Sequence, residues 1–198
     1  MKTVILIGDS IRLGYQPVVA EELGNRARVC GPEANGGDTR NLLEHLEEWV
    51  MGAGADVVHV NAGLHDIRRP FGAKEPTVPL EEYRCNVDLI LRRITEQAGA
   101  DAAWATTTPV NQRRHHQRKS FDRFEEDVLT YNRVALEVCQ ELGVPVDNLF
   151  EVVMDAGRDR LLAEDGVHFT EEGYRLLGRA VADAVRKCCL MGEEGTDA

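Results

Sequence analysis

The residues best suited to chemistry in this sequence lie near its two ends. Ser10 follows a short aliphatic run and the turn residues Gly8 and Asp9, a position that exposes a hydroxyl above a sheet. Asp165 and His168 precede the last helical segment at a spacing that can place the carboxylate beside one imidazole nitrogen. The other nitrogen is then free to take the serine proton. These residues predict a nucleophilic serine with a histidine base.

Two further polar segments are predicted at strand ends. Residues 35–39 read Asn-Gly-Gly-Asp-Thr, where a glycine can present a bare backbone N–H group. Glycine pairs are also common in ordinary turns, so this segment fits both interpretations. Residues 61–66 read Asn-Ala-Gly-Leu-His-Asp, which places the imidazole of His65 just after a strand. Chemistry is therefore predicted in four separate segments that the fold must bring together.

Alternating strands and helices are predicted to position these segments. Short apolar runs predict five strands, at residues 4–7, 26–30, 56–61, 102–106 and 144–146. Helical spacing of apolar residues predicts helices at about 16–23, 39–50, 80–94, 120–142 and 170–188. This alternation predicts a three-layer α/β/α, doubly wound fold around a five-stranded parallel sheet. In such folds ligands bind beyond the carboxyl ends of the strands.

One domain is predicted over residues 1–191, because no internal repeat or low-complexity linker divides the chain. The acidic tail at 192–198 is predicted to fray. Ser120 and Thr170 are predicted to cap the last two helices. The segments at 68–79 and 111–119 are predicted as loops, and we expect the loops 68–79 and 109–119 to shape the pocket.

Composition excludes several classes of protein. Of the 198 residues, 43% are hydrophobic, and 34 acidic residues against 23 basic ones give a net charge of −11. This balance argues against a nucleic-acid-binding protein and a peripheral membrane protein, both of which normally need a basic surface. No apolar run is long enough for a membrane span. The five cysteines are odd in number and lack a CxxC pair, which predicts reduced thiols, no metal site and a cytoplasmic location.

The four segments together resemble the GDSL, or SGNH, hydrolases. The resemblance rests on the Gly8-Asp9-Ser10 turn, Gly-Asp-Thr at 37–39, Gly-x-x-Asp at 63–66 and Asp-x-x-His at 165–168, in that order. It covers residues 1 to about 185 and implies a flavodoxin-like fold that hydrolyses esters through an acyl-enzyme. It implies that Ser10 is the nucleophile, that His168 is the base and then the acid, and that Asp165 orients His168. It also implies oxyanion donors at the Ser10 and Gly37 N–H groups and in the third motif.

The third motif departs from the family pattern. The family usually has Asn in Gly-x-Asn-Asp, whereas this chain has His65. A neutral imidazole still offers one N–H donor, so stabilisation of an oxyanion is chemically feasible. We therefore predict that His65 replaces the asparagine donor.

Basic residues gather in the predicted loops that follow strands. Nine basic and four acidic residues fall in the windows 11–16, 31–40, 62–79 and 109–119. Two interpretations are open, because exposed arginines in long loops often have no specific role. Alternatively, a positive rim attracts a substrate with a carboxylate, sulfate or phosphate near the ester. In the second interpretation, Arg68, Arg69 and Arg114 are the candidate substrate-binding residues.

The prediction is a serine esterase that needs no cofactor and acts on a small-molecule ester, such as an acylated carbohydrate or metabolite. One alternative is a catalytically silent ligand-binding module of the same fold. A lysophospholipase or thioesterase of this fold is another. A nucleotide-binding domain is disfavoured because the first turn, residues 8–12, lacks a phosphate-binding glycine motif. The sequence does not predict the oligomeric state.

Overall fold

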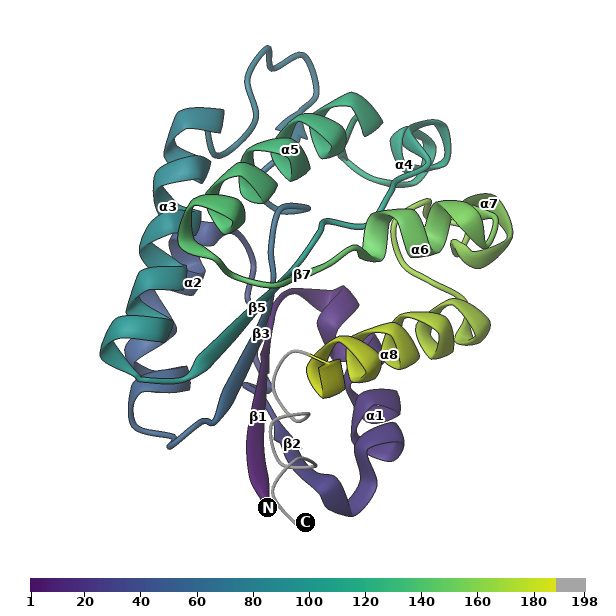
Figure 1. Ribbon diagram of the computed structural model, residues 1–198. Coiled ribbons are helices and arrows are strands. Elements are labelled where there is room, and N and C mark those ends of the chain that lie inside the picture. The colour runs from purple at the N-terminus through teal and green to yellow at the C-terminus, as the bar shows by residue number, and fades with distance from the viewer. Residues whose placement is uncertain (188–198) are drawn as a thin grey trace.

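The computed structural model describes residues 1–187, whose core is one five-stranded sheet with helices on both faces (Figure 1). The strands are β1 (Lys2–Ile7), β2 (Ala27–Cys30), β3 (Val57–Asn61), β5 (Asp101–Ala105) and β7 (Val146–Asp147). Their order is β2-β1-β3-β5-β7, and every neighbouring pair is parallel. The predicted three-layer α/β/α fold is therefore confirmed.

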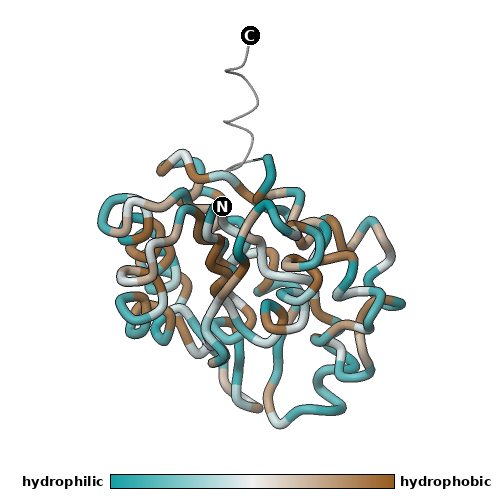
Figure 2. The backbone as a smooth tube through the Cα atoms, turned by 90° about the horizontal axis from the view of Figure 1, so that it is seen from below, coloured by the Kyte–Doolittle hydropathy of each residue, from teal (hydrophilic) through white to brown (hydrophobic). Residues whose placement is uncertain are grey.

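The central strands carry mostly apolar residues on both faces because helices cover both faces of the sheet. Val4 to Ile7 of β1 are each at most 2% exposed, and all five residues of β3 are buried. Figure 2 shows these strands as a hydrophobic band through the interior. This packing fixes the carboxyl ends of β1 and β3 beside each other, which is where the polar segments begin.

The helices divide into two layers. The helices α1 (Ser10–Leu23) and α8 (Glu171–Val185) pack together on one face of the sheet, whereas α2 (Thr39–Leu46), α3 (Leu80–Arg92) and α5 (Glu125–Leu142) lie on the other (Figure 1). The remaining helical segments are short: η1 (Gly24–Arg26), η2 (Glu47–Met51), η3 (Arg93–Gln97), α4 (Gln112–Arg118), α6 (Leu149–Asp155) and α7 (Arg158–Leu161).

Two helix starts differ from the sequence prediction. The first helix begins at Ser10 rather than near residue 16, because the Oδ1 atom of Asp9 accepts a hydrogen bond from the Ile11 N–H at 2.9 Å and caps it. The fifth helix begins at Glu125 rather than after Ser120, because residues 121–122 form a strand. The cap predicted at Thr170 is confirmed, since its Oγ1 accepts from the Gly173 N–H at 3.2 Å. Cys188 and the tail at 192–198 lie outside the described residues.

A second, two-stranded sheet joins the two segments that were predicted as loops. The strand β4 (Arg69–Pro70) pairs antiparallel with β6 (Phe121–Asp122), and residues 112–118 form α4 instead of an open loop. Strands of two residues have no alternation of apolar and polar positions for a sequence pattern to detect. This small sheet positions the residues around the candidate site.

A buried polar pair crosses the main sheet. The Nε2 atom of His59 in β3 lies 3.0 Å from Oδ2 of Asp147 in β7, and His59 is fully buried. The strand between them, β5, has alanine opposite both residues, at Ala103 and Ala105. These small side chains leave room for His59 and Asp147 to meet across β5.

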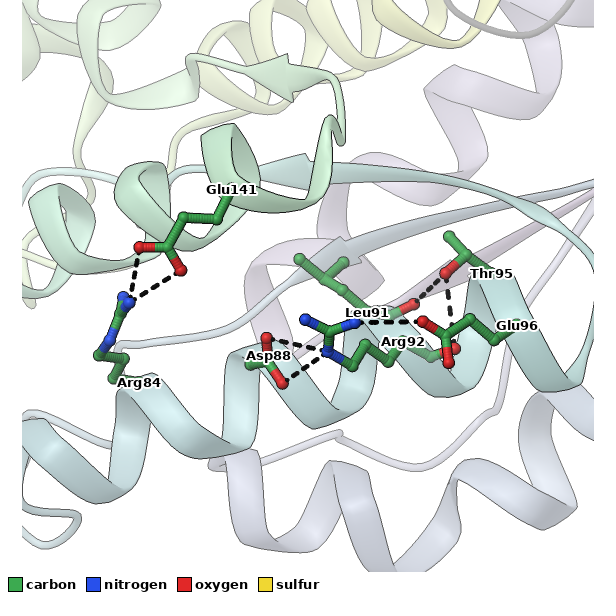
Figure 3. A network of polar contacts seen from close by, with 7 residues as sticks. All are labelled: Arg84, Asp88, Leu91, Arg92, Thr95, Glu96 and Glu141. Carbon is green, nitrogen blue, oxygen red and sulfur yellow. Dashed lines mark hydrogen bonds and ion pairs between the residues drawn. The ribbon is translucent and has the colours of Figure 1, made fainter.

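The outer surface of α3 carries a network of ion pairs (Figure 3). Arg92 pairs with Asp88 at 3.0 Å and with Glu96 at 3.2 Å on the same helix and its extension, while Arg84 reaches Glu141 of α5 at 2.7 Å. Exposed ion pairs of this kind each contribute about 0–1 kcal/mol, so packing of the two helices supplies most of the stability here. Among the helices of residues 1–187, none is long and apolar enough to cross a membrane.

Candidate active site

Ser10 lies where β1 ends and α1 begins. The turn is tight at Gly8, where an added Cβ would lie 2.8 Å from the carbonyl oxygen of Asn61. As the first residue of α1, Ser10 has a backbone N–H group without an intrahelical acceptor. Both the hydroxyl and this N–H group therefore lie at the carboxyl edge of the sheet.

The hydroxyl of Ser10 forms a hydrogen-bonded chain with two residues from the other end of the sequence. Its Oγ atom lies 2.9 Å from Nε2 of His168, and Nδ1 of His168 lies 2.6 Å from Oδ2 of Asp165. When Nδ1 carries the proton and donates to Asp165, Nε2 is the acceptor for the serine proton. This arrangement suits a nucleophilic hydroxyl with a general base.

The carboxylate of Asp165 is held by several donors. Its Oδ1 atom accepts from the N–H groups of Val167 and His168 at 3.1 and 3.0 Å, and Lys119 approaches its Oδ2 at 3.0 Å. Burial alone raises the pKa of Asp165, but the hydrogen bonds from His168, Lys119 and Val167 outweigh it and leave the pKa well below its ordinary value. Asp165 is thus ionised at neutral pH and can stabilise a positive charge on His168.

Arg12 ties the Ser10 turn to the loop after β2. This side chain is fully buried, and its Nη2 donates to the carbonyl oxygen of Ala34 at 2.9 Å. The Gly36 N–H donates to the Gly8 carbonyl oxygen at 2.9 Å, which makes a second link. Both contacts fix residues 34–37 against the start of α1.

The Gly37 N–H group points to an acceptor in its own loop. It donates to Oδ1 of Asn35 at 2.9 Å, and Gly37 has a φ of +63°, a conformation that favours glycine. Asp38 follows and caps α2 through the Asn41 N–H at 3.0 Å. An oxyanion bound by Gly37 would therefore share or replace the bond to Asn35.

His65 lies half-buried among charged side chains. Burial lowers its pKa from the ordinary value. The carboxylates of Asp9 and Asp38 oppose this shift, whereas the cations Arg123 and Arg68 add to it. His65 is therefore neutral at pH 7 and has one N–H donor.

Asp66 connects the third motif to α2 rather than to His65. Its Oδ1 atom accepts from both the N–H and the hydroxyl of Thr39, at 3.0 and 2.6 Å, while its buried Oδ2 has no partner among the described residues. Burial raises the pKa of Asp66 to about 7, although the two hydrogen bonds from Thr39 act to lower it. Below about pH 7 the Asp66 carboxyl group is therefore mostly protonated in the folded protein.

Asp66→Asn is expected to remove part of the pH dependence of stability. Between about pH 4 and 7 the folded protein keeps a proton on Asp66 that the unfolded chain has released, so rising pH destabilises the wild type. Asparagine keeps an acceptor for Thr39 and does not titrate. The free energy of unfolding in urea is measured for both proteins. The value for the variant minus the value for the wild type should rise by about 1–3 kcal/mol between about pH 5 and pH 8. If this difference in the free energy of unfolding is the same at both pH values, the raised pKa of Asp66 is contradicted.

The three candidate substrate-binding arginines have different surroundings. Arg69 forms a bidentate pair with Asp127, at 2.9 and 2.6 Å, so its charge is already compensated. Arg114 donates to the carbonyl oxygen of Asp159 at 3.0 Å. Arg68 is exposed, and its guanidinium carbon lies 4.0 Å from the centre of the Phe121 ring. Of the three, Arg68 is the one whose charge contributes to the pKa of His65.

Sequence reasoning missed Lys119 as a partner of Asp165 and missed Arg123 entirely. Arg123 is 5% exposed, and its Nε donates to the carbonyl oxygen of Leu64 at 2.5 Å, next to His65. Arg123 lies in a segment that the sequence predicts as helix, outside the predicted loops in which basic residues gather. Neither its residue type nor its spacing therefore indicated a place near the site.

Known proteins are similar to this chain in sequence and in fold along most of its length. Residues 6–176 match the GDSL-like Lipase/Acylhydrolase family. The Arabidopsis thaliana GDSL esterase/lipase CPRD49 is 23% identical over 93% of this chain and 78% of that protein. Among solved structures, the Enterococcus faecalis lipase/acylhydrolase superposes with a TM-score of 0.79, at 22% identity, over 94% of this chain and 96% of that one. Axe2, an acetylxylan esterase from Geobacillus stearothermophilus, gives 0.75 at 21% identity, over 93% and 94%.

Proposed function

Because the chain belongs to the GDSL-like lipase/acylhydrolase family, and so is an SGNH-type ester hydrolase, we propose that it cleaves a small carboxylic ester through an acyl-enzyme on Ser10. The observation that carries the proposal is the hydrogen-bonded chain from Ser10 Oγ to His168 Nε2, at 2.9 Å, and on to Asp165 at 2.6 Å. No cofactor enters this chemistry, since the side chains supply nucleophile and base.

The proposed reaction has two halves. Ser10 Oγ attacks the ester carbonyl while His168 Nε2 takes its proton, and the imidazolium then gives that proton to the departing alcohol. Water, deprotonated by His168, attacks the acyl-serine, and the imidazolium returns the proton to Ser10 Oγ as the acid leaves. Asp165 acts in both halves by holding the Nδ1 proton and balancing the charge on His168.

The proposed oxyanion hole combines three donors: the backbone N–H groups of Ser10 and Gly37 and the imidazole of His65. The first residue of a helix supplies one donor. The bond between Gly37 and Asn35 must open or be shared when substrate binds. The lowered pKa of His65 keeps it neutral, so it donates one hydrogen bond without adding a full charge.

Replacing His65 tests this role. His65→Ala is expected to lower kcat by about 10²–10³-fold, because it removes one donor to the oxyanion. His65→Asn should keep kcat within roughly tenfold of the wild type, since its amide also offers an N–H donor. Steady-state hydrolysis of one activated ester by all three proteins gives the comparison. Full activity in the alanine variant would exclude His65 as a donor.

We propose a short acyl group, such as acetyl, on a carbohydrate or metabolite. Two structural relatives, Axe2 and AlAXEase, are acetyl xylan esterases by name, which makes acetyl esters the first compounds to test. We also propose a cytoplasmic location. The free thiols Cys30, Cys85 and Cys139 support it.

A series of para-nitrophenyl esters tests the proposed reaction. The wild-type protein should hydrolyse the acetate with a higher kcat/KM than the octanoate. A reversed order would contradict the short acyl group and favour a lipase-like substrate. Absence of hydrolysis of all of these esters, together with millimolar binding of an acetylated sugar, would instead favour a ligand-binding module of the same fold.

A further inference from the structure

Two arginines contact one aromatic ring beside the candidate active site. The guanidinium carbons of Arg68 and Arg123 lie 4.0 and 5.0 Å from the centre of the Phe121 ring. The small sheet explains this meeting, because Arg68 immediately precedes β4, Phe121 is in β6 and Arg123 follows β6. We call Arg68, Phe121 and Arg123 the arginine cluster.

Arg123 carries a nearly buried charge that no carboxylate contacts directly. Its one hydrogen bond within the described chain is from Nε to the Leu64 carbonyl oxygen. The two terminal nitrogens have no hydrogen-bond partner there, and Arg123 is 5% exposed. Burial lowers the pKa of Arg123 to about 10. The charge of Arg68 also lowers this pKa, whereas the carboxylates of Asp9 and Asp165 raise it. The side chain therefore stays cationic at neutral pH.

Arg68 places a second cation against the same aromatic ring. It is exposed, and in residues 1–187 its side chain contacts the Phe121 ring but pairs with no acid. This contrasts with Arg69, its neighbour in the sequence, which is neutralised by Asp127. Two like charges beside one ring repel each other, and removing Arg123 from water adds a further cost. An anionic group that contacts both guanidinium groups would offset both costs.

The arginine cluster lies next to the residues proposed for catalysis. Arg123 holds the carbonyl of Leu64, which directly precedes His65, and both arginines are close enough to affect the pKa of His65. Asp9 and Asp165, which flank the nucleophile and the base, are close enough to affect the pKa of Arg123. Lys119, two residues before Phe121, approaches Asp165 at 3.0 Å, so an anion bound by the cluster would lie near the proposed catalytic residues.

We propose that Arg68 and Arg123 bind a carboxylate or phosphate group on the alcohol part of the substrate, so that the enzyme selects anionic esters. This inference rests on the proposed esterase function. The alcohol part is the site of the charge because the proposed acyl group is too short to carry one. Guanidinium groups suit this task, since their planar fork can donate two hydrogen bonds to a carboxylate or phosphate.

Matched aryl acetates test the proposal. The anionic probes are para-acetoxybenzoate and para-acetoxyphenyl phosphate, which distinguish a carboxylate from a phosphate. The neutral probe is para-acetoxybenzamide. The readout is the ratio of kcat/KM for each anionic probe to that for the neutral probe, compared between variants so that differences in leaving group cancel.

Arg68→Gln and Arg123→Gln are each expected to lower this ratio by about 10- to 100-fold, mainly through KM for the anionic probe. In Arg68→Gln, at the exposed position, kcat/KM for the neutral ester should change by less than about threefold. Arg123→Lys keeps the positive charge but lacks the planar guanidinium group, so it tests whether anion binding needs that group as well as the charge. Arg92→Gln is the matched control, because Arg92 is exposed at the end of α3 that leads to the amino end of β5, opposite the site. Its ratio should equal that of the wild type.

The outcomes separate this inference from the function on which it rests. Equal losses for anionic and neutral esters in both arginine variants, with Ser10 still labelled by a fluorophosphonate, would overturn the anion site and leave the esterase. If Arg123→Gln fails to fold, as a thermal melt would show, Arg68→Gln at the exposed position decides the result. If no ester is hydrolysed, calorimetric binding of para-acetoxybenzoate and of the amide to Ser10→Ala still measures the preference for the anion. Equal affinities would overturn it.

Discussion

Ser10→Ala is expected to lower kcat for an acetyl ester by roughly 10⁴–10⁶-fold while leaving the fold intact. Loss of Oγ removes the atom that forms the covalent bond, and within residues 1–187 no other hydroxyl or thiol hydrogen-bonds to Nε2 of His168. KM should change little, because the hydroxyl contributes more to reaction than to ground-state binding. Steady-state hydrolysis with a sensitive chromogenic acetate measures the loss.

The Ser10→Ala variant has a simple structural control. The helix α1 is capped by Asp9, not by Ser10, so the alanine variant keeps the cap and should melt within about 2 °C of the wild type. A variant that is folded and retains more than about one-hundredth of the wild-type kcat would show that Ser10 is not the nucleophile.

Asp165→Asn is expected to lower kcat by about 10⁴-fold. The amide oxygen can still accept from the Val167 and His168 N–H groups, so the turn should persist. The amide cannot balance a charged His168, and its NH₂ group favours the imidazole tautomer that has the proton on Nε2. That tautomer cannot take the proton of Ser10.

The matched control for Asp165→Asn is Asp159→Asn. Asp159 is an exposed carboxylate that pairs with Arg158 on α7, so this change removes the same charge from the neighbouring surface. We expect its kcat to lie within about twofold of the wild type. Comparable losses in the two variants would assign the effect to net charge rather than to orientation of His168.

The sequence was sufficient for the parallel type of the main sheet and for the order of the motifs, although β7 (Val146–Asp147) shares only Val146 with the strand predicted at 144–146. Aliphatic runs such as residues 4–7 are distinctive because strands buried on both faces need apolar residues throughout. Ser10 could be singled out because it follows a predicted strand, and Asp165 and His168 because they precede a predicted helix. The structure brings these three into one hydrogen-bonded chain.

The surroundings of the site could not be predicted in the same way. The start of α1 depends on a single capping bond from Asp9, and β4 and β6 have only two residues each. Tertiary pairing of these short segments decides which arginines are neutralised. Asp127 compensates Arg69, whereas Arg68 and Arg123 meet at Phe121, and no local pattern distinguishes these cases.

The central claim is that His168 activates Ser10 as a nucleophile. Its most direct test is labelling with a fluorophosphonate, followed by mass spectrometry of the labelled peptide. We predict one adduct on the peptide that contains Ser10, formed by the wild type and abolished in Ser10→Ala, with labelling greatly slowed in His168→Ala. A folded wild-type protein that stays unlabelled while a control serine hydrolase reacts, or an adduct on another residue, would contradict the claim.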